Sequence, residues 1–170
     1  DFCLSRGLGD VYKRQFQEGI VRVNTKIQYS VRALFDIAYY NMGGPTQVKD
    51  IARRQQISPR YLEQIFRRLK TAGLLRARRG PRGGYTLAKQ PEEITLGNII
   101  RAVEGPIELV FCVGENKGRQ RCIMAGRCVT TSVWKELGQK ISEFFDTISI
   151  ADLCARGKRL GISQEFLEAS

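Results

Sequence analysis

The sequence predicts a mostly helical protein with one small β-hairpin. Apolar residues recur at three- and four-residue steps through most of the chain, which is the spacing of one helix face. A Ser-Pro pair at residues 58–59 separates two short helical patterns, and a Gly- and Pro-rich turn at residues 80–84 separates two strand-like segments. Taken in order, these features predict a winged helix-turn-helix followed by a long C-terminal helix.

The composition restricts the class of protein. The chain has 170 residues, 42% of them hydrophobic and 26% charged, which is typical of a soluble globular protein. No apolar stretch reaches the roughly 18 residues of a membrane span, and no signal peptide is recognisable, so we expect a cytoplasmic protein. Because the chain has no histidine, imidazole-based zinc sites and His-dependent nucleophilic catalysis are excluded, and we do not expect an enzyme.

Nearly all of the positive charge lies in one segment. The formal net charge is +11, and residues 45–90 contain twelve basic and two acidic side chains. The rest of the chain contains 16 basic and 15 acidic residues. A solvated face kept for solubility would spread its charge more evenly, whereas clustered cations are typical of phosphate contact. The segment therefore predicts binding to nucleic acid.

The first helical pattern begins at Thr25. Residues 1–22 have neither helical nor strand periodicity, and we interpret them as a non-native or disordered leader. From Thr25 the chain forms one apolar face that ends at Gly43-Gly44-Pro45 and consists of Ile27, Val31, Leu34, Phe35, Ala38 and Met42.

Two short helices with a tight turn between them follow. The first is expected within residues 46–56; Ser58 and Pro59 open the second as N-cap and first-turn proline, and Gly73 ends it. Its predicted buried face is Leu62, Ile65, Phe66 and Leu69. Its outward side chains can hydrogen-bond base edges or pair with phosphates: Arg60, Tyr61, Glu63, Gln64, Arg67, Arg68 and Lys70.

The Gly- and Pro-rich turn carries basic residues at its tip. Residues 74–79 and 85–89 are expected to pair as the strands of a hairpin, with Arg79 and Arg82 at the turn. An ordinary solvated hairpin tip is the alternative, but a basic tip directly after a helix-turn-helix favours a DNA-contacting wing. We therefore assign residues 23–92 to a winged helix-turn-helix DNA-binding domain.

A cysteine-containing loop at residues 112–128 divides the rest of the chain. Before it, residues 93–111 contain a connecting helix capped by Thr95. After it, residues 129–155 contain a long helix and a short last helix, and residues 156–170 form a polar tail. The long helix could pack within its own domain. However, its heptad spacing favours a homodimer interface formed by Trp134, Leu137, Ile141, Phe144 and Ile148.

Three cysteines lie close together in a loop rich in Gly and cations. Nine residues separate Cys112 from Cys122, and five separate Cys122 from Cys128. Nearby cations stabilise thiolates, the form in which cysteine binds metal. The spacing equally allows buried thiols, a redox disulfide with one cysteine left over, or zinc with Cys3 and an oxygen ligand. Cys154, among apolar residues of the last helix, is expected in the core.

Three segments occur in an order that is specific to one family. They are YSVRAL at residues 29–34, ISPRYLEQIF at residues 57–66 and RGPRGGY at residues 79–85. Over residues 23–155 the sequence resembles the IscR/NsrR-type (Rrf-two) family of bacterial winged-helix transcriptional regulators. The resemblance implies a homodimer on a roughly palindromic DNA operator. It implies base or phosphate contacts from Ser58, Arg60, Tyr61, Glu63 and Gln64, and minor-groove entry by Arg79. It also implies a 2Fe–2S or 4Fe–4S cluster on Cys112, Cys122 and Cys128.

Two features depart from the iron–sulfur members of this family. The gap between Cys112 and Cys122 is longer, and no fourth ligand is recognisable. Thr131 stands where one branch has a histidine, and Gln28 where another has a carboxylate. Other ligands could be Glu104, Glu115, a thiol, water or a small molecule. Our hypothesis is a regulator whose iron–sulfur cluster senses redox, nitric oxide or iron status; the alternative is a cluster-free regulator controlled by thiol oxidation, a metabolite or a partner protein.

Overall fold

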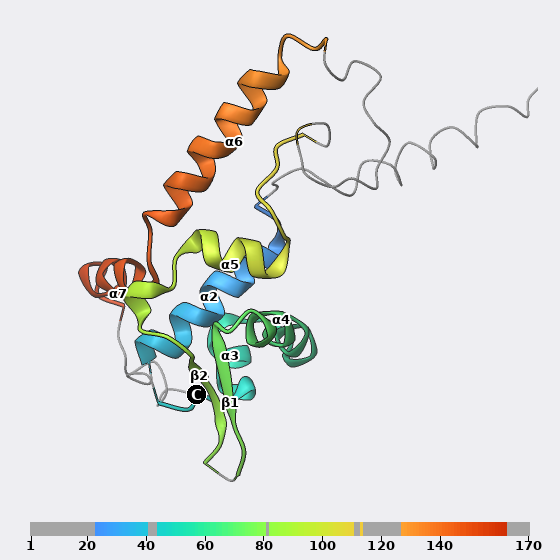
Figure 1. The fold of residues 1–170 in the computed structure, drawn as a ribbon. Coiled ribbons are helices and arrows are strands. Elements are labelled where there is room, and N and C mark those ends of the chain that lie inside the picture. Colours follow the sequence, from blue (N-terminus) through green and yellow to red (C-terminus); the bar gives the residue numbers. More distant parts are fainter. Residues whose placement is uncertain (1–22, 41–43, 81, 111–112, 114–126, 163–170) are drawn as a thin grey trace, which may run out of the picture. The chain divides into compact units, whose positions relative to one another are not determined.

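The computed structural model describes residues 23–40, 44–80, 82–110, 113 and 127–162 (Figure 1). The chain divides into two compact units. The larger contains the described residues of 23–105 and 142–162, and the smaller contains the described residues between 106 and 141. The predicted leader, residue 42, Cys112 and Cys122 lie outside the described residues.

Helix α2 (Thr25–Tyr40) forms the centre of the larger unit. It begins after Asn24, whose side chain accepts a hydrogen bond from the Ile27 N–H (3.0 Å). It contacts α3, α4, α5 and α7. The predicted apolar face was therefore too narrow, because neighbours on several sides also bury Ser30, Asp36 and Tyr39.

The predicted helix-turn-helix is confirmed as α3 (Val48–Gln55) and α4 (Pro59–Thr71). Gln56 adopts a left-handed conformation with φ 54°, which turns the chain between the two helices. The Ser58 hydroxyl then accepts a hydrogen bond from the Tyr61 N–H at 3.3 Å and so caps α4. All four apolar residues predicted for the buried face of α4 are buried: Leu62, Ile65, Phe66 and Leu69.

The hairpin is also confirmed. Strands β1 (Leu75–Arg78) and β2 (Gly84–Leu87) are antiparallel, with Leu75 opposite Leu87. Figure 1 shows the hairpin extending away from the helices of this unit. Backbone hydrogen bonds of 2.8 and 3.0 Å join Tyr85 to Thr46, the residue two positions before α3. Gly84 allows this approach, because a Cβ there would lie 2.5 Å from the Thr46 carbonyl oxygen.

The C-terminal half adds a 3₁₀ helix, η1 (Pro91–Glu93), and three helices, α5 (Leu96–Val103), α6 (Thr131–Asp146) and α7 (Ile150–Arg159). Thr95 caps α5 as predicted, accepting from the Asn98 N–H at 3.1 Å. Helix α7 continues four residues beyond the predicted end. No helix among the described residues is long and apolar enough to cross a membrane.

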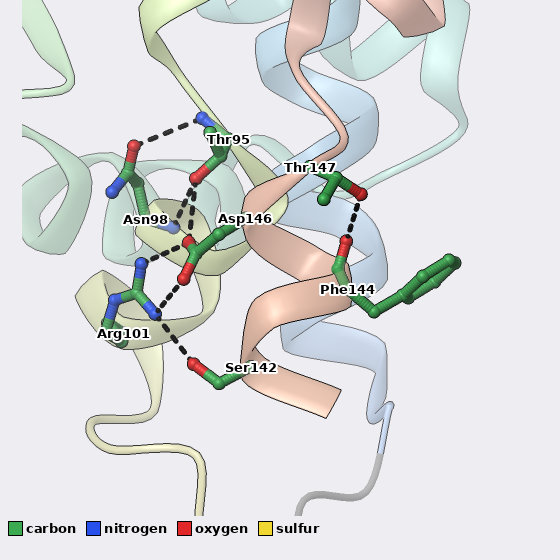
Figure 2. Close-up of polar contacts among 7 residues, drawn as sticks. All are labelled: Thr95, Asn98, Arg101, Ser142, Phe144, Asp146 and Thr147. Carbon is green, nitrogen blue, oxygen red and sulfur yellow. Dashed lines mark hydrogen bonds and ion pairs between the residues drawn. The ribbon is translucent and has the colours of Figure 1, made fainter. Parts of the chain in front are cut away.

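A polar clasp joins the end of α6 to α5 (Figure 2). Arg101 donates to both carboxylate oxygens of Asp146, at 2.5 and 3.1 Å, and to the Ser142 hydroxyl at 3.2 Å. The Thr95 hydroxyl donates to the same carboxylate at 3.2 Å. Backbone hydrogen bonds between residues 94–96 and 148–150 continue this connection. The end of α6 is therefore fixed to α5 and to the residues just before it.

Candidate nucleic-acid interface

Helix α4 presents one polar face to solvent. Because its apolar residues are fixed in the core, the helical period turns the intervening residues outward. Tyr61 is half-buried, and the other candidate DNA-contacting residues at this end of the helix-turn-helix are exposed: Ser58, Arg60, Glu63, Gln64 and Arg67. The predicted outward set therefore faces solvent from a rigid support.

Residues of α2 and α3 support the beginning of α4. The ring of Tyr61 meets that of Tyr29 edge to face, with centroids 5.9 Å apart. The Arg32 guanidinium lies 5.4 Å from the centroid of the Tyr29 ring and donates to both the side chain and the backbone carbonyl of Gln55. Sequence reasoning assigned no role to Tyr29 or Arg32, although their three-residue spacing on one face of a helix is a usable signal.

A buried ion pair fixes α3 against α2. The side chain of Asp36 is fully buried and that of Arg54 is 6% exposed. Arg54 Nε donates to Oδ2 and Oδ1 at 2.9 and 3.1 Å, and Nη2 donates to Oδ1 at 2.5 Å. Gln55 adds a hydrogen bond of 2.9 Å. Burial alone would lower the pKa of Arg54, but its hydrogen bonds with Asp36 raise it. Because its side chain is buried in this pair, Arg54 does not belong to the exposed cationic surface that the charge count implied.

The wing carries an exposed set of arginines. Arg79 and Arg82 are exposed at the hairpin turn, and Arg76 and Arg78 are exposed on β1. The Tyr85 ring on β2 lies 4.6 Å from the Phe66 ring of α4, centroid to centroid. The hairpin is therefore packed directly on the helix that presents the polar face.

The predicted dimer face is exposed along α6. Trp134, Leu137 and Phe144 are 39%, 40% and 60% exposed, although they are large and apolar. Ile141 is half-buried. Ile148 is half-buried too, but it lies after the end of α6 and so does not continue the helical seam.

Of the three loop cysteines, only Cys128 lies among the described residues. The Thr130 hydroxyl is 3.1 Å from its sulfur, and hydrogen bonds with Thr130 and Thr131 lower its pKa to about 7. Burial raises the pKa of the Cys154 thiol, which is half-buried in α7. Within the described ranges, no group of three potential metal ligands is assembled.

Glu104, considered above as a ligand, is already paired. Its carboxylate lies 2.8 Å from Lys26 Nζ and accepts a hydrogen bond of 2.9 Å from Asn24. Partial burial would raise the pKa of Glu104, but the hydrogen bonds from Lys26 and Asn24 lower it overall. In this arrangement the carboxylate links α5 to the beginning of α2.

Comparison with known families decides the class of protein. Residues 23–156 match the sequence profile of the Rrf2 family, which is described as "Iron-dependent Transcriptional regulator". The chain belongs to the Rrf2 family. It is 39% identical over 133 residues to the HTH-type transcriptional regulator IscR of Serratia proteamaculans (strain 568), a match that covers 78% of this chain and 79% of that protein. The IscR of Aliivibrio salmonicida (strain LFI1238) is also 39% identical, over 78% of this chain and 77% of that protein.

Solved structures of similar transcriptional regulators have the same fold. T. potens IscR matches with a TM-score of 0.66 and 36% identity, over 88% of this chain and 97% of that one. CymR (YrzC), "the Global Cysteine Regulator of B. subtilis", matches with a TM-score of 0.62 and 31% identity, over 81% and 98%. The protein is therefore a winged-helix transcriptional regulator of the Rrf2 family, and this class acts by binding DNA.

Proposed function

We propose that the protein binds an operator as a homodimer, with α4 in the major groove and the wing against the backbone or in the minor groove. The observation that carries this proposal is the exposed polar face of α4. The opposite, apolar face of the same helix is buried, and its Phe66 packs against Tyr85 of the arginine-bearing hairpin. This is the form that a base-reading helix with an adjacent phosphate-binding element requires.

The side chains divide into two chemical groups. Gln64 can form two hydrogen bonds to adenine and Glu63 can accept from the amino group of cytosine, so both suit base reading. Arg60, Arg67 and Arg82 suit phosphate contact, and Arg79 suits the narrow minor groove. The hydroxyls of Ser58 and Tyr61 stand at the end of the helix that enters the groove first in such complexes.

Dimerisation would use the apolar face of α6. Trp134, Leu137 and Phe144 expose more apolar surface than a solvated helix needs, and a second copy of the helix offers the same face in return. A two-fold dimer would place its two α4 helices on half-sites about 34 Å apart, which is one turn of DNA.

Two signals remain candidates for control of DNA affinity. Cys112, Cys122 and Cys128 would hold an iron–sulfur cluster, which supplies a centre sensitive to oxidants, nitric oxide and iron supply. The lowered pKa of Cys128 suits this role, because the thiolate is the ligating form. The alternative is direct thiol oxidation, which the same thiolate would favour. A similar protein, CymR of Staphylococcus aureus, has been crystallised in an oxidized form, which is 28% identical with a TM-score of 0.61 over 78% of this chain and 95% of that one.

DNA binding is tested with Arg79→Met on a duplex that the unmodified protein selects from a random-sequence pool. We expect a loss of about 1–3 kcal/mol of binding free energy at fixed salt. Arg156→Met is the matched control, because this exposed arginine lies on α7. Equal affinities for unmodified protein and Arg79→Met would remove the wing from the proposal.

The cluster is tested by anaerobic purification with iron and sulfide analysis. We expect visible absorbance that Cys122→Ala abolishes and Cys154→Ala keeps. Colourless protein without iron or sulfide would reject the cluster and favour the thiol alternative. In that case, oxidant-dependent DNA binding that is lost in Cys128→Ser is the expected result.

A further inference from the structure

We propose that Arg68 of α4 is a positioning residue that holds the DNA-reading helix against the end of α5, and that it does not bind DNA phosphate. This inference rests on the proposed role of α4 in DNA binding. It separates two adjacent arginines, Arg67 and Arg68, to which charge and spacing assign the same role.

The guanidinium of Arg68 has a defined partner. Its Nη1 donates a hydrogen bond of 2.7 Å to the backbone carbonyl of Val103, the last residue of α5. A carbonyl in the last turn of a helix receives no hydrogen bond from an N–H of the same helix, so its donor must come from elsewhere. Arg68 supplies that donor from a helix 35 positions away in the sequence.

A second cation reaches the same carbonyl from α2. Lys26 Nζ lies 3.4 Å from the Val103 oxygen and 2.8 Å from the Glu104 carboxylate. The positive charge of Arg68 also contributes to the lowered pKa of Glu104, after the larger effects of burial, which opposes it, and of hydrogen bonds from Lys26 and Asn24. Three helices thus meet at the C-terminal end of α5, where the helix dipole favours cations.

This junction explains how α4 is held along its length. The Tyr29 and Tyr61 rings brace its beginning, the core residues fix its apolar face, and Arg68 ties its last turns to α5. An Arg68 side chain that reached for DNA would leave the carbonyl of Val103 with Lys26 alone, at a longer distance. Arg67 and Arg68 are both exposed. What separates them is that the Arg68 guanidinium is hydrogen-bonded to Val103. Arg67 lies one position earlier and about 100° around the helix, where it faces solvent and is available for phosphate.

The matched substitutions Arg67→Met and Arg68→Met distinguish the two roles. Affinity for the selected duplex is measured by fluorescence anisotropy from low to high salt. Each phosphate contact contributes about 0.9 to the slope of log affinity against log salt, so Arg67→Met should reduce that slope by about this amount. Arg68→Met should weaken binding about threefold to tenfold with an unchanged slope. A reduction of the slope by about 0.9 in Arg68→Met would overturn the proposal.

Amide hydrogen exchange supplies a readout that does not depend on DNA. The N–H groups of Glu104 and Gly105 bond to the carbonyls of Ile100 and Arg101, at 2.8 and 3.1 Å. Their exchange should accelerate about threefold to tenfold in Arg68→Met and stay unchanged in Arg67→Met. Unchanged exchange, or faster exchange with unchanged DNA affinity, overturns the positioning role. If neither Arg67→Met nor Arg79→Met changed the affinity for the selected duplex, that result would instead reject the proposed DNA-binding surface.

Discussion

Replacing Arg54 by methionine should lower the free energy of unfolding by about 3–5 kcal/mol. The substitution leaves the Asp36 carboxylate in the core without its counter-charge. Asp36 is fully buried, and among the described residues Arg54 provides all but one of its side-chain hydrogen bonds. Of these bonds, the one from Gln55 at 2.9 Å would remain.

The size of this effect follows from the difference between breaking a buried pair and replacing it. Removing one partner leaves a charge that has lost its water and its counter-ion, whereas replacing both by apolar groups is close to neutral. A loss of about 3–5 kcal/mol is large against the total stability of about 5–15 kcal/mol that domains have. Arg54→Met should therefore be mostly folded only at low denaturant and low temperature.

The assay is urea unfolding followed by circular dichroism, on Arg54→Met, Asp36→Leu and the double variant. The double variant should be more stable than the sum of the two single losses predicts, by about 1–3 kcal/mol. Arg53→Met is the control, because Arg53 is the exposed neighbour on α3 and should change stability by less than about 0.5 kcal/mol. Additive losses, or a loss below about 1 kcal/mol in Arg54→Met, would refute the reasoning.

Three further predictions concern the cap of α4, the wing and the loop thiol. Ser58→Ala removes the cap on the Tyr61 N–H and should cost about 1 kcal/mol in urea unfolding, whereas Ser58→Asp should keep most of it. Gly84→Ala places a Cβ 2.5 Å from the Thr46 carbonyl oxygen and should break the Thr46–Tyr85 bridge, seen as faster exchange of both amides. Because its pKa is lowered to about 7, Cys128 should alkylate with a midpoint near pH 7, whereas Cys154 should require a pH above that of an ordinary thiol. A Cys128 midpoint that stays above pH 8 would contradict this assignment, and Thr130→Val should move the midpoint upward.

The sequence was informative where structure is local. Ser58 and Pro59 predict the start of α4, and the spacing of its four apolar residues predicts the buried face, because capping and helical period depend on near neighbours. The hairpin follows in the same way from its Gly- and Pro-rich turn. These local patterns explain why the winged helix-turn-helix could be predicted from the residues alone.

The roles of individual cations could not be predicted in this way. Arg54 and Arg68 belong to the same basic segment as Arg67, yet one is buried against Asp36 and the other bonds to Val103. Their partners lie 18 and 35 residues away in the sequence, and a charge count contains no such distances. The predicted place of Ile148 in the helical seam failed for a similar reason. The heptad spacing continues in the sequence, but α6 ends at Asp146, and the backbone of residues 148–150 then bonds to that of residues 94–96.

Helix α5 connects these observations, because it binds α4 at its last residue and the end of α6 through Arg101. The hydrogen bond from Arg101 lowers the pKa of Asp146, so the clasp contributes stability above the usual pKa of aspartate and loses it as the pH falls through the lowered value. Both side chains are more than a third exposed, so this electrostatic contribution is small. The clasp also depends on Gly97, because a Cβ there would lie 2.0 Å from Asp146 Oδ1. A side chain at position 97 would therefore displace the Asp146 carboxylate from Arg101 and weaken the connection between α5 and the end of α6.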